Sequence, residues 1–289
     1  MSLLNIYDKQ YKKILFIPLS ILILSFISII VQTAQTGSFV NQGVSIAGGL
    51  TLTIQGTTTD SIELQNFLKN KFSGADISVR DLKSAGQKTG LIIDSSEISS
   101  DELIEAVEEK IDIEEDNYTV EEIGSALGQS FFKQTLFAIL IAFLFMAIVV
   151  FIYFRTLVPS LAIVLSAVSD IVITLAAFNL LGFKLSTAGI AAFLMIVGYS
   201  VDTDILLVTK VLRRKEGTVF ERVCSAAKTG LMMSATTFSA IIVALIFAQS
   251  DVLRQIMIIL LIGLFVDLMS TWFQNAAIMR IYMEKRHQE

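Results

Sequence analysis

The sequence has 289 residues, of which 54% are hydrophobic and only 2 are proline, with a formal net charge of −5 and a mean hydropathy of +0.69. Soluble domains contain about 45–50% apolar residues even when glycine is counted, so this composition excludes an ordinary soluble protein. The single cysteine, Cys224, excludes an internal disulfide, and the single histidine, His287, excludes histidine-ligated metal sites and histidine acid–base catalysis.

The charged residues are unevenly distributed. Residues 33–130 contain 6 of the 22 basic residues and 17 of the 27 acidic ones, a net −11, whereas the remainder has 16 basic and 10 acidic residues, a net +6. We interpret this pattern as an acidic, water-facing domain within a membrane protein whose spans have basic flanks.

The chain begins with a polar segment, residues 1–13, which holds Lys9, Lys12 and Lys13 and which we expect in the cytoplasm. The first membrane span is expected at residues 14–32. A basic start followed by an apolar run also describes a cleaved signal peptide. Because this run is long, has no clear cleavage pattern and precedes further spans, we interpret it as a retained anchor.

Residues 33–131 alternate strand-like and helix-like patterns. Ser99 and Glu102 form a capping box at the start of one expected helix. The order predicts a small α+β domain of βαββα type, like part of a ferredoxin-like fold. The expected strands lie within 44–54 and at 77–82 and 90–94, and the expected helices at 61–71, 99–111 and 119–130.

Residues 132–280 are expected to form five further membrane spans. A basic segment, residues 210–229, separates two of them and is expected to be cytoplasmic, either as a helix along the membrane surface or as a plain loop. Residues 281–289 form the expected cytoplasmic tail. With the first span, the chain is predicted to be a six-helix polytopic membrane protein. The five spans are expected at 134–154, 157–181, 185–209, 231–248 and 255–279.

The basic residues predict the orientation of these spans. With the N-terminus inside, the inner segments hold thirteen Lys and Arg residues, and the short outer connections hold only Lys133, Lys184 and Arg254. Since positive residues favour the cytoplasmic side, we expect both termini in the cytoplasm and residues 33–131 outside it, in a cell membrane.

Four acidic residues fall within the expected spans, namely Asp170, Asp202, Asp204 and Asp267. An Asp near the centre of a membrane helix costs about 2.5–3.5 kcal/mol on insertion scales, so such residues are functional by default. No Lys or Arg lies at membrane depth to pair with them. They are therefore proton-relay candidates that would be neutral part of the time. The alternative is a structural role, with each acid protonated or hydrogen-bonded to a Ser or Thr.

Asp202 and Asp204 lie about 200° apart on a helix, so they cannot face the same narrow cavity. We expect Asp202 to line the proton path, in a bundle of the last four spans with their polar faces inward. Small or hydroxyl-bearing residues are expected to support this path: Gly198, Tyr199, Ser200, Thr203, Thr236 and Thr237.

Four motifs in order along the chain resemble the SecF family of protein-export membrane proteins: GVSIAGG at 43–49, IGSALG at 123–128, SDIVIT at 169–174 and GYSVDTD at 198–204. The Asp-x-Asp form resembles the archaeal branch. Bacterial members usually have an acid at Ser45, a proline at Ser125 and Asn-Asp-Thr at 202–204. The bacterial acid falls on Thr203 by counting, so Asp202 and Asp204 both remain candidates.

The resemblance implies an auxiliary subunit of Sec-dependent protein export, related to the resistance-nodulation-division (RND) transporters. It implies SecD as a partner, with the Sec translocon channel and the translocating unfolded polypeptide, and use of the proton gradient. Neither an enzyme, a cofactor, a metal nor a nucleic-acid partner is expected. Two alternatives stay open: an RND-type small-molecule or lipid transporter, which the single small outer domain disfavours, and a non-transporting scaffold of the translocon.

Overall fold

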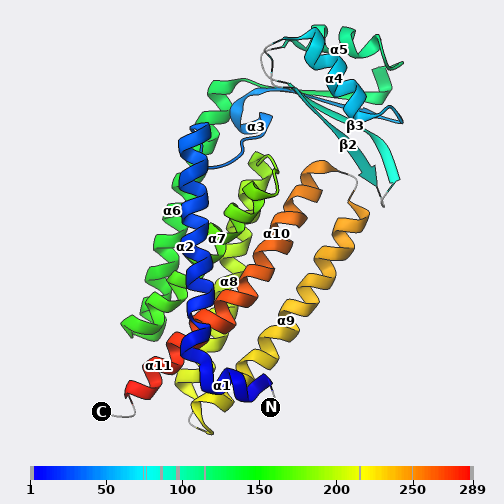
Figure 1. Ribbon diagram of the computed structural model, residues 1–289. Coiled ribbons are helices and arrows are strands. Elements are labelled where there is room, and N and C mark those ends of the chain that lie inside the picture. Colours follow the sequence, from blue (N-terminus) through cyan, green and yellow to red (C-terminus); the bar gives the residue numbers. More distant parts are fainter. Residues whose placement is uncertain are drawn as a thin grey trace.

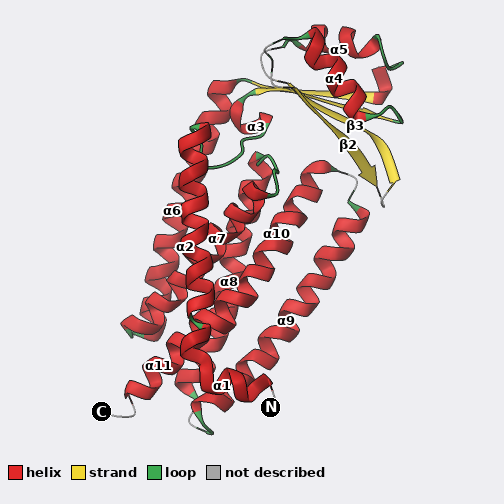
Figure 2. Cartoon of the chain, in the orientation of Figure 1, coloured by secondary structure: helices red, strands yellow, loops and turns green. Residues whose placement is uncertain are grey.

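The computed structural model describes residues 3–73, 75, 77–84, 87–95, 98–113, 115–214, 216–248 and 250–286. Lys215 and His287 lie outside these residues. The chain forms a long helical bundle with a small α+β domain at one end, and both termini lie at the other end (Figures 1 and 2).

Within the described residues, six helical segments are long and apolar enough to cross a membrane, which confirms the six predicted spans. The last span is built from three consecutive pieces, of which the middle one, η2, is a π-helix. The helices are α2 (Phe16–Thr36), α6 (Ser125–Phe154), α7 (Leu157–Leu180), α8 (Thr187–Arg213), α9 (Val219–Phe247), and then α10 (Asp251–Met269), η2 (Ser270–Asn275) and α11 (Ala276–Arg286).

The expectation of a loop or a surface helix at residues 210–229 is wrong. Instead, α8 continues to Arg213, and α9 begins at Val219 after a capping box in which Thr218 and Glu221 satisfy each other's backbone N–H groups. The buried Arg222 joins the two helix ends by donating to the carbonyls of Val211 (2.9 Å) and Arg214 (2.6 Å). The basic residues of this segment therefore extend two spanning helices.

The interior of the bundle is formed mainly by α7, α8 and the last span. In the most apolar stretch of α7, 56% of the residues are buried, and in that of α8 50% are buried. The corresponding fractions are 6% for α6 and 17% for α9. The sequence predicts four inward-facing spans, and α9 departs from this because most of its surface is exposed.

The outer domain has a four-stranded antiparallel sheet in the order β2-β3-β1-β4. The predicted helix at residues 119–130 is wrong in its first half and correct in its second: Tyr118–Ile123 is a strand that pairs with β1, and α6 begins at Ser125. This last strand covers an edge of β1 that would otherwise expose unpaired backbone groups. The domain thus has the complete βαββαβ order of a ferredoxin-like fold. Its strands are β1 (Gly49–Gln55), β2 (Ile77–Ser84), β3 (Gln87–Ser95) and β4 (Tyr118–Ile123), and its helices are α3 (Val44–Ala47), α4 (Ser61–Lys71) and α5 (Ser100–Glu108).

One face of the sheet is covered by α4 and α5, and the other face is turned toward the bundle (Figure 2). Alternation along β1 explains this arrangement, because Leu50, Leu52 and Ile54 are buried against the helices. Thr51 and Thr53 lie between them and face the bundle side, where they line a cavity of about 480 Å³. The hydrophobic core that the sheet forms with α4 and α5 is therefore separate from the bundle, whereas Ile46 of α3 packs with bundle residues.

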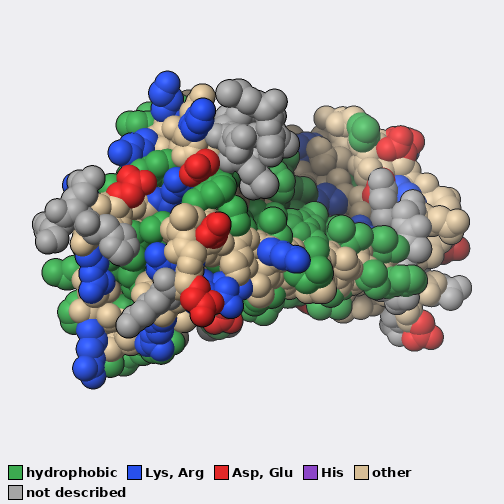
Figure 3. Space-filling model, turned by 90° about the horizontal axis from the view of Figure 1, so that it is seen from below, with side chains coloured by type: hydrophobic (Ala, Val, Ile, Leu, Met, Phe, Trp, Pro, Cys, Tyr) green, Lys and Arg blue, Asp and Glu red, His purple; other side chains and the backbone are tan. Residues whose placement is uncertain are grey.

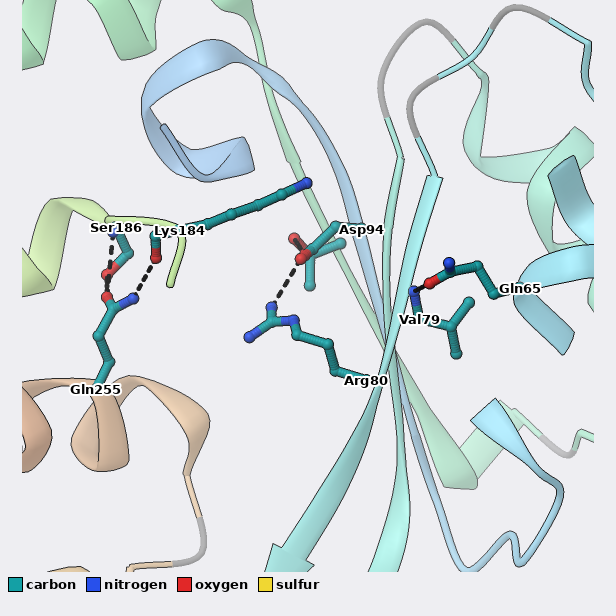
Figure 4. A network of polar contacts seen from close by, with 8 residues as sticks. Gln65, Val79, Arg80, Asp94, Lys184, Ser186 and Gln255 are labelled. Atoms are coloured by element: carbon teal, nitrogen blue, oxygen red, sulfur yellow. Dashed lines mark hydrogen bonds and ion pairs between the residues drawn. The ribbon is translucent and has the colours of Figure 1, made fainter. Parts of the chain in front are cut away.

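Backbone and side-chain hydrogen bonds fasten the outer domain to the bundle. Leu185, in the α7–α8 turn, donates to the Asn41 carbonyl (2.6 Å) and accepts from the Gly43 N–H (2.8 Å). Gln255 of α10 supports this turn through the Lys184 carbonyl (2.5 Å) and the Ser186 N–H (3.1 Å), as Figure 4 shows. The turn is thus held from both sides.

At the opposite end, the N-terminal helix α1 (Leu3–Ile14) is fastened to α11. Asp8 and Arg280 form an ion pair of 2.6 Å, and the Arg280 guanidinium lies between the rings of Tyr11 (4.0 Å) and Phe220 (5.1 Å). The Tyr7 hydroxyl donates to the Trp272 carbonyl at 2.6 Å. Seen from below, many Lys and Arg side chains gather around this end of the molecule (Figure 3).

Candidate functional site: a buried carboxylate cluster

Three of the four membrane acids meet in the interior of the bundle. Asp170 of α7, Asp204 of α8 and Asp267 of α10 are 0%, 0% and 1% exposed. Within the described part of the chain, no lysine or arginine forms an ion pair with any of them. Three buried anions without a cation would be strongly destabilised, so the cluster must hold at least one proton.

Hydroxyl groups from neighbouring helices hold Asp170 in place. Its two carboxylate oxygens accept hydrogen bonds from Ser200 of α8 and Ser270 of η2. Each donor is itself fully buried. Asp170 therefore links three elements at one point of the interior.

Thr271 connects the other two acids. Its hydroxyl oxygen lies 3.0 Å from Asp204 Oδ1 and 3.1 Å from Asp267 Oδ1. Asn275 Nδ2 also donates to Asp204 Oδ1 (2.6 Å), and the Thr203 hydroxyl lies 3.1 Å from Asp267 Oδ1. A threonine hydroxyl has only one hydrogen, so Thr271 can donate to just one of its two carboxylates at a time.

This geometry can carry a proton. A protonated Asp204 can donate to the Thr271 oxygen while Thr271 donates to Asp267. When Asp267 is the protonated acid, the same two hydrogen bonds run in the opposite direction. One shift moves a proton from Asp204 to Asp267 without leaving an extra charge on Thr271. The other carboxyl oxygen of Asp204, Oδ2, is buried and forms no hydrogen bond with the described groups.

The π-helix η2 supplies most of the partners of the acids. The Ala276 N–H bonds to the Thr271 carbonyl five residues earlier, which widens the turn. As a result Ser270, Thr271, Gln274 and Asn275 are all completely buried and turned inward. Gln274 pairs with Ser169 (3.2 Å), next to Asp170.

The structure places Asp202 outside the cluster. It is exposed on α8, on the same stripe as Gly198, around which there is open space, and as Met195, which is 50% exposed. The helical spacing correctly separates the two acids, but the expectation that Asp202 lines the inner path does not fit this position. Asp204 faces inward instead, and Thr203, the position of the bacterial acid, is buried against Asp267.

The remaining supporting residues contribute unequally. Ser200 and Thr203 bind the acids, and Tyr199 donates to Ser234 of α9 (3.1 Å). Thr236 and Thr237 donate to the Met233 carbonyl of their own helix, so they do not reach the acids. Asn275 was not expected from the sequence. The signal that points to it is its spacing, because it follows Asp267 and Thr271 at successive intervals of four.

The comparisons with known proteins agree with this architecture. Residues 103–285 match the family described as "Protein export membrane protein SecD/SecF, C-terminal". The chain is 40% identical to the protein-export membrane protein SecF of Pyrococcus furiosus over 95% of this chain and 92% of that protein. It is 38% identical to SecF of Methanocaldococcus jannaschii over 95% and 96%.

The fold resembles that of SecDF, a translocon-associated membrane protein from Thermus thermophilus, whose crystal structure aligns with a TM-score of 0.77 at 19% identity. The alignment covers 98% of this chain but only 40% of SecDF, so the chain spans about two-fifths of that protein. A SecDF structure in a super-membrane-facing form aligns less closely, with a TM-score of 0.61 at 22% identity, covering 97% of this chain and 39% of that one. The motifs, the six-span architecture and the similarity to SecF proteins over nearly their full length show that the chain belongs to the SecF family of protein-export membrane proteins.

Proposed function

We propose that the protein acts with SecD as a subunit of the Sec export machinery and that it uses the proton gradient through a relay formed by Asp204, Thr271 and Asp267. The observation that carries the proposal is the single hydroxyl of Thr271 between two buried carboxyl groups. A structural role would be met by separate donors for each acid. A shared donor makes the protonation of one acid depend on that of the other.

A moving proton would also change how the helices are held together. Asp204 on α8 is bound to Thr271 and Asn275 of η2, and Asp267 on α10 is bound to Thr203 of α8. An ionised carboxylate accepts such hydrogen bonds more strongly than a neutral acid does. Proton transfer therefore redistributes the contacts between α8 and the last span, which is the link from the relay to movement of the bundle.

The orientation proposed for the protein places both termini in the cytoplasm and the α+β domain outside. Two features support it: the Lys and Arg side chains around the terminal end (Figure 3) and the acidic composition of the outer domain. In this orientation the outer domain is the part available to the translocon channel and to the unfolded polypeptide as it emerges.

The partnership with SecD is supported by the exposed stripe of α8. Asp202 and Gly198 lie on the surface of a membrane helix, where a carboxyl group facing lipid is costly. A partner that covers this stripe removes the cost, and the open position of Gly198 permits another helix to approach closely. The likeness to SecDF, of which this chain covers two-fifths, is in keeping with a second subunit.

The test is export in proteoliposomes that contain the SecD complex, measured with and without a proton gradient. Asp204→Asn keeps the size of the side chain but cannot take part in proton exchange as an acid. We expect it to abolish the stimulation by the gradient and to leave gradient-independent export unchanged. Asp202→Asn is the matched control on the same helix, and we expect it to retain the stimulation. Full stimulation in Asp204→Asn, with SecD still bound, would show that the cluster is structural.

A further inference from the structure

A cleft of about 250 Å³ lies between α8, α9 and α10, beside the carboxylate cluster. α8 and α10 are in close contact at Gly263, and α9 forms the remaining wall of the cleft. A Cβ atom on Gly263 would lie only 2.3 Å from Ile196 Cδ1. The cleft is lined by Met195, Ile196, Tyr199, Thr237, Ile241, Leu260, Gly263, Leu264 and Asp267.

Most residues that line the cleft are apolar, and the hydroxyl groups among them are already hydrogen-bonded. The hydroxyl of Thr237 is bound to the Met233 carbonyl, and that of Tyr199 donates to Ser234. These two side chains therefore present carbon atoms and satisfied hydroxyls to the cavity. Water or an ion would find few partners there, whereas an uncharged apolar molecule would fit the lining.

The cleft reaches the side of the bundle at Met195, which is 50% exposed. Ile242, Val243 and Ile246, which follow Ile241 on α9, are 45%, 55% and 51% exposed. They belong to a helix that is long and apolar enough to cross a membrane. An occupant would therefore arrive from the lipid phase rather than from water.

Asp267 sets this cleft apart from an ordinary groove. Of the three clustered acids, Asp267 lines this cleft, whereas Asp170 and Asp204 do not. Asp267 also forms the end of the relay, through Thr271 and Thr203. A molecule in the cleft would thus be next to a carboxyl group that is otherwise buried.

We propose that this cleft binds uncharged, apolar small molecules dissolved in the membrane, and that they reach Asp267 from the lipid side and block its exchange of protons. The blocking effect rests on the relay proposed above. The binding and the access to Asp267 do not, and they can be measured without any export assay.

A hydrophobic carbodiimide, dicyclohexylcarbodiimide, is a suitable probe because it reacts with carboxylic acids from within the lipid phase. The acid proton adds to one nitrogen and the carboxyl oxygen bonds to the central carbon, which gives an O-acylisourea. This product rearranges to a stable N-acylurea, so the whole reagent is retained and no oxidant or leaving group is involved. The modified residue can then be identified by mass spectrometry of peptides.

The experiment treats membranes containing the full chain together with SecD. We expect modification of Asp267 and none of Asp170 or Asp204. A charged, water-soluble carbodiimide should leave Asp267 unmodified. Excess dicyclohexylurea, which has a similar shape but does not react, should occupy the cleft and protect Asp267 without any substitution in the protein.

A pair of variants tests the cleft itself. Ile241→Trp fills the space, and we expect it to abolish labelling of Asp267. Ile242→Trp adds the same ring at the adjacent, lipid-facing position and should leave the labelling intact. Retained SecD binding in both variants shows that the fold is preserved.

Two results would overturn the proposal. One is equal labelling of all three acids, or labelling by the water-soluble reagent, because either would mean that the cluster opens by another route. The other is labelling of Asp267 in the isolated chain that disappears when SecD is bound, since the cleft would then be a subunit contact. If Asp204→Asn disproves the relay, labelling of Asp267 through the cleft is still expected, so the two proposals fail separately.

Discussion

Thr271 shows how much can depend on one hydroxyl group. Thr271→Val has nearly the same shape but removes the donor shared by Asp204 and Asp267. Loss of a partner for a buried polar group costs about 1–3 kcal/mol, and we expect a decrease of this size in the free energy of unfolding. We also expect gradient-dependent export to be lost. Both quantities are measured with the chain in detergent and in proteoliposomes.

Thr271→Ser is the matched control for this change, because it keeps the hydroxyl and removes only a methyl group. It should retain most of the gradient-dependent export and lose less stability than Thr271→Val. If the valine and serine variants behaved alike, the hydroxyl would have no role in the relay.

At the scale of elements, the contact between α9 and η2 depends on Gly230. A Cβ atom there would lie 2.3 Å from Trp272 Cζ2 and 2.9 Å from Cη2, and the rigid indole ring cannot yield as a flexible chain can. Overpacking of this kind typically costs about 1–3 kcal/mol. Gly230→Ala should therefore lower the unfolding temperature of the isolated chain in detergent, although alanine is the better helix former.

Gly198→Ala provides the comparison, since no atom lies within 4 Å of the added Cβ. In a helix interior, alanine stabilises a protein by roughly 0.5–1 kcal/mol relative to glycine. This variant should therefore be as stable as the original or more stable. The explanation through Trp272 would be wrong if Gly230→Ala were stabilised to the same extent.

The elements differ in how far they could be foreseen. The six spans followed from hydropathy, and α4 and α5 from apolar spacing and the Ser99–Glu102 capping box. The strand β4 was mistaken for a helix because it is short and runs almost directly into the long apolar helix α6. Its conformation is determined by pairing with β1, which lies about seventy residues earlier and which no local pattern reveals.

The site shows the same division between local and long-range information. Helical spacing separated Asp202 from Asp204 on opposite faces, but it could not say which face would be covered. That depends on the packing of α7 and α10 against α8. The π-turn was also hidden, because the sequence from Ser270 to Asn275 reads as ordinary helix.

At the scale of the whole molecule, the exposed stripe on α8 indicates that the bundle is one part of a larger assembly. Gly198→Leu places a bulky side chain where close approach of a partner helix is expected. We expect the isolated chain to keep its unfolding temperature, because the position is open, and co-purification with SecD in mild detergent to decrease sharply.

Ala138→Leu on the exposed face of α6 is a matched enlargement at another membrane-facing position. It should leave SecD bound. Equal retention of SecD by both variants would place the subunit contact elsewhere on the bundle.

The ion pair between Asp8 and Arg280 has a consequence for how the protein is made. These residues are separated by 272 positions, and the rings of Tyr11 and Phe220 close around the same guanidinium. During synthesis, α1 leaves the ribosome long before its partner in α11 exists, so the first helix must wait undocked while the other spans enter the membrane. Completion of the last helix is thus the event that fixes the first one, and a chain that stops short of Arg280 leaves its basic N-terminal helix without this attachment.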